Sequence, residues 1–366
     1  MADDDDFSEE EEGLEYMLGF ARSPEGGPAS LLRHQFPSKM GGRPAWLDPV
    51  HLPTRDQLTC QATGQPLNFL LQVYAPLEAE REDAFHRALF LFVTPQGPAV
   101  TKPGAVRAFR CQLPRKNPYY SFEPPKPDDL APPDLPAAAV ESSLAADPWR
   151  TLEAEPAVAA ACKASSAGTG NGTGNGNSST QGAGSGKPAP NKVSLHLYPE
   201  LELDVEPEDR ETEQEDAALT KLMEDYDSRV ESEGELTEEE VPEEVLNQVE
   251  ENCPIDRKHF AMFQARVSCA PDQVIRYCFR DGASPLWPSP ANLPTLADVP
   301  PCKRCGAPRK FEFQVMPQLL NHLQQDEMDP AALDWGTIVV YTCSKSCSGP
   351  PGGAKYDEEF VWVQPS

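Results

Sequence analysis

The sequence predicts an α+β fold: two duplicated β-rich modules joined by a disordered linker and an acidic helical segment. Three observations lead to this prediction. Short apolar runs punctuated by Pro and Gly occur in two separate parts of the 366-residue chain. These two parts share a repeated pattern of residues. Between them lie a Gly/Ser/Asn-rich stretch and a strongly acidic one, and neither composition can bury a hydrophobic core.

The N-terminal module is predicted at 33–122, after an acidic, disordered N-terminus at 1–32. Residues 1–12 contain eight acids and no bases, and dense runs of like charge repel one another and rarely pack. Three apolar runs in the module have the length and flanking residues of buried strands: Leu67–Tyr74, Ala88–Val93 and Ala105–Phe109.

A disordered linker is predicted at 123–192, where Pro and Ala give way to Gly, Ser, Asn and Thr. Apolar and polar residues then alternate over 193–206, which predicts a half-buried strand interrupted by Pro199. This strand has no neighbour in sequence, so we expect it to dock on one of the modules. The acidic segment with weak helical patterns follows at 207–251. Residues 200–251 contain 23 acids and three bases.

The C-terminal domain is predicted at 252–366. One helix is expected from Asp256 through Val267, and a second from Pro271 through Cys278, because proline suits the first helical turn. Three later runs predict strands: Phe311–Val315, Thr337–Thr342 and Glu359–Val363.

An internal repeat relates the two modules. Gly41–Thr54 and Gly282–Thr295 share seven identities at the same spacing. A Cys-x3-Gly pattern follows in both copies, at Cys60 and at Cys302, and a Gln-Val pair stands twelve positions after each cysteine. The agreement indicates a duplicated β-rich unit.

Four cysteines in two short-spaced pairs give the strongest chemical signal: Cys302, Cys305, Cys343 and Cys347. Such pairs are typical of a structural four-cysteine zinc site, which leaves the metal no open position for catalysis. We therefore predict one structural zinc ion in the C-terminal domain. Disulfide pairing and a thioredoxin-like redox role remain as alternatives. The first module keeps Cys60 but has Thr63 and Thr94 where thiols are needed, so we expect it to be free of metal.

The same sequence argues against several classes of function. There is no HExxH, GxSxG, P-loop or Rossmann pattern, so no enzyme is expected. No apolar run approaches the ~18–20 residues of a membrane span, and the acidic N-terminus does not look like a signal or transit peptide. We expect a protein of the reducing cytosol or nucleus. The formal charge of −28 disfavours direct nucleic-acid binding and favours a basic partner.

The chain resembles the programmed cell death protein 2 family over 33–122 and 193–366. These segments carry the resemblance: Phe36–Leu47, Leu67–Pro76, Gln112–Asn117, Phe311–Asn321, Asp334–Gly336 and Glu358–Trp362. Animal members carry a MYND zinc finger between the halves. Here that place holds a linker with the single Cys162, so the finger-less branch, programmed cell death protein 2-like, is expected to be the nearer relative.

The resemblance implies an adaptor and dedicated chaperone in ribosome biogenesis. Its client would be a basic small-subunit ribosomal protein of the S-five type (eukaryotic ribosomal protein S two), bound by a monomer. An exposed sheet edge could pair with an extended client segment. Two alternatives remain: a zinc-containing protein-interaction scaffold, or a transcription-linked regulator of proliferation and apoptosis. A basic patch at the first cysteine pair would favour the second.

Overall fold

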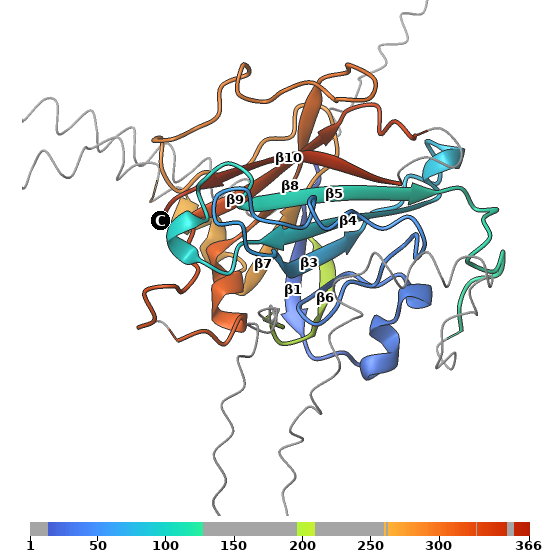
Figure 1. The fold of residues 1–366 in the computed structure, drawn as a ribbon, viewed down its shortest axis with the longest axis horizontal. Coiled ribbons are helices and arrows are strands. Elements are labelled where there is room, and N and C mark those ends of the chain that lie inside the picture. The colour runs from blue at the N-terminus through green and yellow to red at the C-terminus, as the bar shows by residue number, and fades with distance from the viewer. Residues whose placement is uncertain (1–13, 127–195, 209–259, 261–262, 327, 350–354) are drawn as a thin grey trace, which may run out of the picture.

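The structure, a computed structural model, describes residues 14–126, 196–208, 260, 263–326, 328–349 and 355–366. Within these residues the strands follow one another around a closed barrel in the order β1-β6-β2-β3-β4-β5-β10-β9-β8-β7 (Figure 1). All neighbouring strands whose pairing is described run antiparallel.

The N-terminal part of the chain supplies β1 (Met17–Arg22), β2 (Lys39–Met40), β3 (Asn68–Tyr74), β4 (His86–Val93) and β5 (Val106–Leu113). After the first long gap comes β6 (Leu201–Pro207). The C-terminal part supplies β7 (Gln273–Tyr277), β8 (Arg309–Val315), β9 (Thr337–Cys343) and β10 (Tyr356–Gln364). Short 3-10 helices connect them: η1 (Pro28–Leu31), η2 (Arg33–Gln35), η3 (Glu82–Ala84), η4 (Gly97–Ala99) and η5 (Pro317–His322).

The two repeat copies are the two halves of one barrel. Strands β2 to β5 form one half and β7 to β10 the other, in equivalent order. The halves meet on one side where β5 pairs with β10. On the other side, the antiparallel pair of β1 and β6 lies between them, with β1 bonded to β7 and β6 bonded to β2. This strand order is the one expected for two halves related by a pseudo-twofold axis.

An equivalent hydrogen bond in each half supports the duplication at atomic level. The Gln72 side-chain oxygen accepts the amide of Ala45 at 2.8 Å. In the second half, the Gln314 side-chain oxygen accepts the amide of Leu286 at 2.6 Å. Each glutamine belongs to the repeated Gln-Val pair, and each amide immediately precedes the repeated tryptophan.

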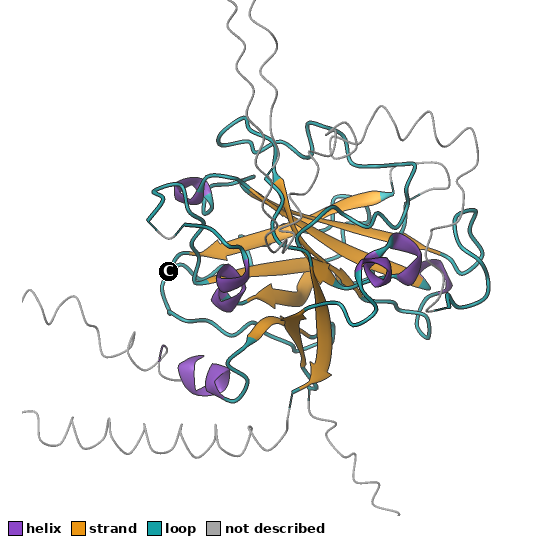
Figure 2. Cartoon of the chain, turned by 90° about the horizontal axis from the view of Figure 1, so that it is seen from below, coloured by secondary structure: helices purple, strands orange, loops and turns teal. Residues whose placement is uncertain are grey.

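The predicted α+β class is wrong. The described residues are mostly β, with short helices at the periphery of the strands (Figure 2). Residues 263–268 are helical, as the first predicted C-terminal helix requires. The second predicted helix, from Pro271, is instead strand β7, because its β-branched Val274 and Ile275 lie in a segment that pairs with both β1 and β8. The predicted acidic helical segment at 207–251 lies almost wholly outside the described residues.

Two strands from outside the predicted modules, β1 and β6, complete the barrel. Strand β1 lies inside the range 1–32 that the sequence predicted to be disordered, and Leu18 is buried there. The apolar run of β1 is short and follows many acidic residues, so the composition of this region is dominated by acids. In the structure, β1 pairs with β6 on one side and with β7 on the other. The predicted docking strand at 193–206 corresponds to β6, which starts only after Pro199. Leu203 is buried as expected, but Leu197 is 43% exposed, because Tyr198 takes the buried position.

Closure of the barrel changes one expectation about partners. Each described strand has a hydrogen-bonded neighbour on both sides, so the exposed module edge expected to pair with a client is not present among them. A closed sheet offers its ends and its outer face for binding in place of an edge.

The barrel has apolar side chains on both faces of its N-terminal half. One cluster fills the interior and includes Leu71, Leu89, Phe313 and Val340. A second cluster covers the outside of β3 to β5 beneath the segment that carries Trp46. Strands β4 and β5 are consequently buried along their whole length.

Candidate metal centre

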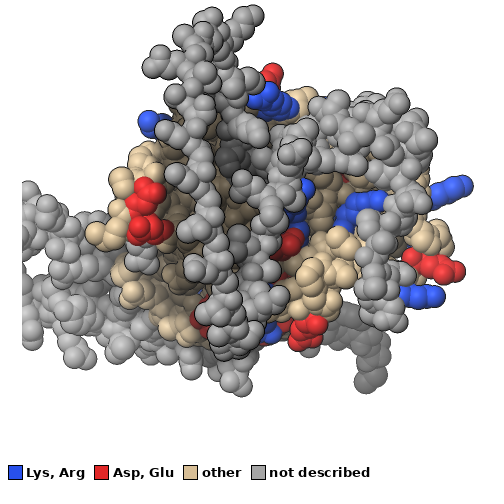
Figure 3. Space-filling view, turned by 60° about the horizontal axis from the view of Figure 1, so that its bottom comes forward, with Lys and Arg blue, Asp and Glu red and all other residues tan. Residues whose placement is uncertain are grey.

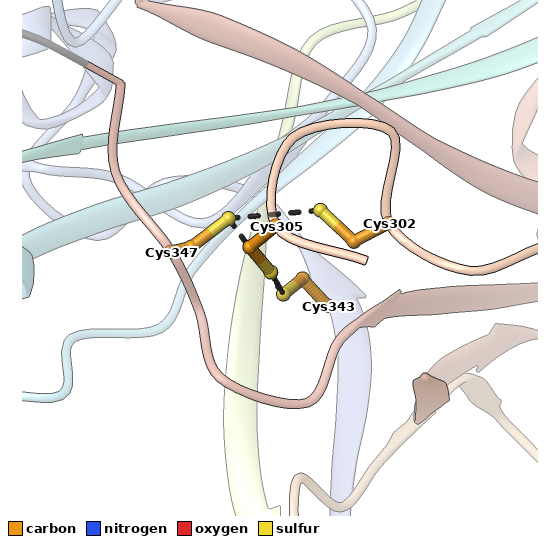
Figure 4. A group of neighbouring side chains, drawn as sticks. All are labelled: Cys302, Cys305, Cys343 and Cys347. Atoms are coloured by element: carbon orange, nitrogen blue, oxygen red, sulfur yellow. Dashed lines mark hydrogen bonds between the residues drawn. The ribbon is translucent and has the colours of Figure 1, made fainter. Parts of the chain in front are cut away.

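The first cysteine pair lies on a tight turn just before β8. The Cys302 amide donates to the Ala307 carbonyl at 2.8 Å, and the Gly306 amide donates to the Cys302 carbonyl at 2.9 Å. Gly306 has φ of 70°, in the left-handed region where a side chain is disfavoured. The turn folds back on itself and directs the Cys302 and Cys305 thiols to one side (Figure 4).

The second pair follows from the end of β9. Cys343 is the last residue of that strand, and Cys347 lies on the turn that leaves it. The Ser346 amide donates to the Cys343 carbonyl at 2.8 Å, and Ser346 has φ of 42°. Because Arg309 of β8 pairs with Cys343 of β9, the β8–β9 ladder brings the two turns together.

The four predicted thiols are brought into one cluster. The ligand atoms of Cys302, Cys305, Cys343 and Cys347 all lie within 4.8 Å of one another. Three of the sulfur–sulfur distances are 3.5, 3.6 and 3.8 Å. A tetrahedron with Zn–S bonds of about 2.3 Å has edges of about 3.8 Å, so the cluster fits zinc. All four thiols are free in the structure, so the alternative of disulfides is not realised there.

The pKa values of three of the four thiols are shifted by their surroundings. The Ala307 amide, with the neighbouring thiols, lowers the pKa of Cys305 to about 7. Burial raises the pKa of Cys343, and burial with neighbouring thiols raises that of Cys347. These shifts oppose ionisation of Cys343 and Cys347 and favour it at Cys305. A divalent ion would permit four thiolates at this spacing, and four thiolate ligands would leave it no open coordination position.

The N-terminal half has the same turn without the thiols. The Cys60 amide donates to the Gln65 carbonyl at 2.7 Å, the Gly64 amide donates to the Cys60 carbonyl at 2.8 Å, and Gly64 has φ of 68°. Burial opposes ionisation of the Cys60 thiol, but the nearby Thr63 and Thr94 side chains outweigh it and lower the thiol pKa. Hydroxyls thus occupy two positions where the second half has cysteines, as the sequence predicted.

Side chains of the N-terminal half hold the loop that carries Cys347. The Arg110 guanidinium donates to the Cys347 carbonyl at 3.0 Å, and the Gln112 amide donates to the Ser346 carbonyl at 2.9 Å. Arg87 Nε donates to the Ser346 hydroxyl at 3.0 Å. The cysteine loop of one half is therefore clamped by strands β4 and β5 of the other.

A buried ionic network lies directly under this loop. Arg87 and Glu312 are fully buried and form a bidentate pair, with one contact of 2.8 Å between Arg87 Nη2 and Glu312 Oε2. Glu312 also accepts from Tyr277 and Thr342. Although burial opposes it, the Arg87 guanidinium keeps the pKa of Glu312 below its usual value.

Sequence reasoning missed these network residues. Arg87 and Arg110 stand in strands that are mostly apolar, and Glu312 interrupts the run Phe311–Val315. A charge inside such a run is a usable signal, since charged side chains are almost never fully buried unless they are paired. The β5–β10 contact adds a second pair, Arg110 with Glu359 at 2.8 Å.

The basic residues around the first cysteine pair do not form a free patch. Each of these four cations has an acidic partner: Lys303 with Glu358, Arg304 with Asp357, Arg309 with Glu359 and Lys310 with Asp281. The described basic side chains on the face shown in Figure 3 are likewise scattered. This weakens the alternative of a nucleic-acid-binding zinc knuckle, because phosphate contacts need unpaired cations on one face.

Two histidines contact side chains of the N-terminal half. His51 Nδ1 lies 2.9 Å from the Asp48 carboxylate in a local turn. His86 stacks on Phe36 with ring centroids 4.3 Å apart and shares a hydrogen bond of 3.0 Å with the Tyr74 hydroxyl. Burial lowers the pKa of His86 to about 4, so the ring is neutral at physiological pH.

Comparisons with known proteins identify the family. Residues 15–127 match the domain "Programmed cell death protein 2, N-terminal domain", and 257–365 match "Programmed cell death protein 2, C-terminal putative domain". Programmed cell death protein 2 of Mus musculus is 40% identical over 351 residues, 95% of each chain. This chain belongs to the programmed cell death protein 2 family. No solved structure matches it.

Shorter alignments connect the chain to other members of the family. Human programmed cell death protein 2-like is 36% identical over 107 residues, 29% of this chain and 28% of its own. A Schizosaccharomyces pombe protein named "Probable 20S rRNA accumulation protein 4" is 32% identical over 124 residues, 31% of this chain and 30% of its own. Because alignments with programmed cell death protein 2 span the whole length, the comparisons do not support the expected nearer relation to the finger-less branch. Cys162 and the MYND position lie outside the described residues.

Proposed function

We propose that the protein is a non-enzymatic adaptor and dedicated chaperone for a basic small-subunit ribosomal protein of the S-five type (eukaryotic ribosomal protein S two), acting as a monomer in the cytoplasm and nucleus. The observation that carries the proposal is family membership together with a relative named for 20S rRNA accumulation. That name points to production of the small ribosomal subunit.

Charge supports a basic client. Residues 1–12 contribute −8, and residues 200–251 contribute −20 (23 acids, three bases), which together equal the net charge of −28. A newly made ribosomal protein is strongly basic and prone to bind RNA non-specifically. A polyanionic partner attracts such a client from a distance and screens it.

The metal centre has a structural role in this proposal. One zinc ion bound by Cys302, Cys305, Cys343 and Cys347 would join the β8 and β9 turns and fix the loop that β4 and β5 hold. No helix in the described residues has the length and apolar character needed to cross a membrane.

Association kinetics with the purified ribosomal protein test the proposal. Neutralising the acids of Glu231–Glu240 should slow association more than it speeds dissociation, because long-range charge acts mainly on encounter. Raising salt from low to physiological concentration should weaken the wild type more than this variant. Absence of binding at any salt, or equal binding to any basic protein, would remove the chaperone role.

A protein-interaction scaffold is the second candidate. The long acidic and low-complexity sequences at 123–192 and 207–251 favour it, since they could contact several partners. Affinity purification dominated by non-ribosomal proteins would favour the scaffold over the chaperone.

A further inference from the structure

We infer that the barrel end formed by β1, β3, β6 and β7 holds an apolar side chain from an extended segment of a basic partner protein. This inference rests on the proposed function, because it names the contact that a basic client would make. It starts from a cavity that the metal centre does not use.

The cavity has a volume of about 240 Å³. Its walls are mostly apolar side chains from strands that are far apart in sequence: Met17, Val73, Leu203, Val205, Ile275 and Tyr277. Two of the polar groups in the lining are already engaged. The Ser38 hydroxyl accepts the Tyr74 amide at 3.0 Å, and the Tyr277 hydroxyl donates to Glu312 at 3.2 Å.

Size and chemistry favour a side chain over a small-molecule ligand. An apolar cavity of roughly 150 Å³ is enough to hold benzene, so this one has room for a Leu or Phe side chain. Pockets for cofactors and drug-sized ligands are usually about 300–1,000 Å³ and present several convergent polar groups. Here the lining supplies no charged group, so binding would come from burial of apolar surface.

Acidic residues flank the cavity on the strand that forms part of its wall. Leu203 and Val205 of β6 face the cavity, and the alternating residues Glu202, Asp204 and Glu206 therefore face outward. Arg22 is paired with Asp204 and Glu206, yet the row remains net negative. A partner that inserts an apolar residue would meet carboxylates beside it.

Both acidic runs of the chain also join the barrel at this point. Met17 pairs with Pro207, and the Glu208 amide donates to the Tyr16 carbonyl at 2.7 Å. The eight acids of 1–12 precede this junction, and the 18 acids and three bases of 209–251 follow it. Since Met17 and Val205 line the cavity, the two most acidic sequences of the protein connect to the rim of its apolar pocket. An apolar anchor flanked by Lys or Arg is the complementary chemistry.

Filling the cavity from its rim tests the inference. Val205 is 42% exposed, so Val205→Trp places an indole over the opening with little demand on the core. Leu296→Trp is the matched control, because Leu296 is 98% exposed and outside the lining. Val205→Trp should weaken binding of the full-length protein to the S-five-type ribosomal protein about tenfold to a hundredfold, the effect of losing one buried apolar side chain. Leu296→Trp should leave binding unchanged.

A peptide measurement separates this inference from the proposed function. Fluorescence anisotropy would compare a short Lys-rich peptide that has one central Leu with the same peptide that has a central Ser. The wild type should bind the Leu peptide about tenfold more tightly, and Val205→Trp should abolish the difference. This outcome is independent of whether the ribosomal protein is the client.

Three results would overturn the inference. First, folded Val205→Trp protein could bind the ribosomal protein as tightly as the wild type does, which would contradict the inference but leave the proposed function intact. The two peptides could bind equally. Light scattering could reveal a wild-type dimer that Val205→Trp dissociates, which would assign the cavity to a second copy of the chain. If Val205→Trp fails to fold, Met17→Trp on the adjacent strand β1, which also lines the cavity, takes its place with the same expectations.

Discussion

The two cysteine turns have the same backbone but different means of support. The turn at Cys60 and the turn at Cys302 share both amide–carbonyl hydrogen bonds and a left-handed glycine. Around Cys60 lies an aromatic-rich apolar cluster with Trp46 and Phe92. Around Cys302 the cluster contains only Ala307 and the cysteines themselves. The same backbone turn therefore occurs with and without a set of four thiols, and ligation by the thiols would take the place of an apolar cluster in the half that lacks one there.

The largest contrast is expected from removing one thiol in each turn. Cys305→Ser leaves three thiols and should unfold the C-terminal half, because ligation energy is folding energy at such sites. Cys60→Ser in the other turn should cost only about 1–2 kcal/mol of stability. Thermal unfolding and elemental analysis would check this, with one zinc per wild-type chain and none in Cys305→Ser. Zinc-free wild type, or two ions per chain, would contradict the assignment.

Loss of the metal centre should also loosen the N-terminal half, because side chains of that half hold the Cys347 loop. Because Arg87, Arg110 and Gln112 bind the loop of Cys347, removal of metal by a chelator should also speed hydrogen exchange in β4 and β5. Exchange that rises only in β8 and β9 would show that the two halves are uncoupled.

The repeated tryptophans offer a smaller test of the same comparison. Trp46 is 7% exposed and contacts Phe90, Phe92 and Tyr356 with ring centroids 5.1 to 5.7 Å apart. Its counterpart, Trp287, is only partly buried. Trp46→Ala should cost about 3–5 kcal/mol, and Trp287→Ala clearly less, as measured by urea unfolding. Equal costs would remove the distinction between packing and ligation.

The buried ion pair tests the junction between the halves. Arg87→Met leaves Glu312 buried without its counter-ion and should cost about 3–5 kcal/mol. The double change Arg87→Met with Glu312→Leu removes both charges and should be closer to the wild type. Denaturant titrations of the two variants measure this, and a double variant as unstable as the single one would assign the cost to packing.

The smallest effect is expected from restoring thiols to the first turn. Thr63→Cys together with Thr94→Cys would place three thiols around the position of Cys60, while Pro98 stands where a fourth would be. We expect this variant to bind a second zinc ion more weakly than the first, with little change in stability of the zinc-free turn. Metal titration followed by elemental analysis decides it, and unchanged stoichiometry would mean that the two turns differ beyond their side chains.

Local patterns predicted local structure well. The apolar runs at Leu67–Tyr74 and Thr337–Thr342 lie in strands, and the cysteine spacing brought four thiols together. The helix expected from Pro271 was wrong, because this segment is held as strand β7 by hydrogen bonds to β1 and β8. Both partners are distant in sequence, so local residue patterns do not reveal them. Strand β1 was missed because the adjacent acids dominate the composition of its surroundings.

Closure of the barrel was beyond sequence reasoning for a different reason. The contact of β5 with β10 joins Ala108 to Glu359, and such non-local pairing leaves no periodic signal. Arg110 and Glu359 form an ion pair across this contact, and each is a charged residue within a predicted strand or next to one. Their pairing can be inferred only after β5 and β10 are known to be neighbours.

The order of the strands has a consequence for synthesis of the protein. Strand β5 leaves the ribosome long before β10, and β1 waits for both β6 and β7. Until the last residues are translated, the first half presents two unpaired strand edges and a buried arginine without its glutamate. Long-range pairing of this kind forms slowly and exposes intermediates to aggregation. The nascent chain would then itself need protection, and a stop codon anywhere before Tyr356 would remove β10 and leave the barrel open.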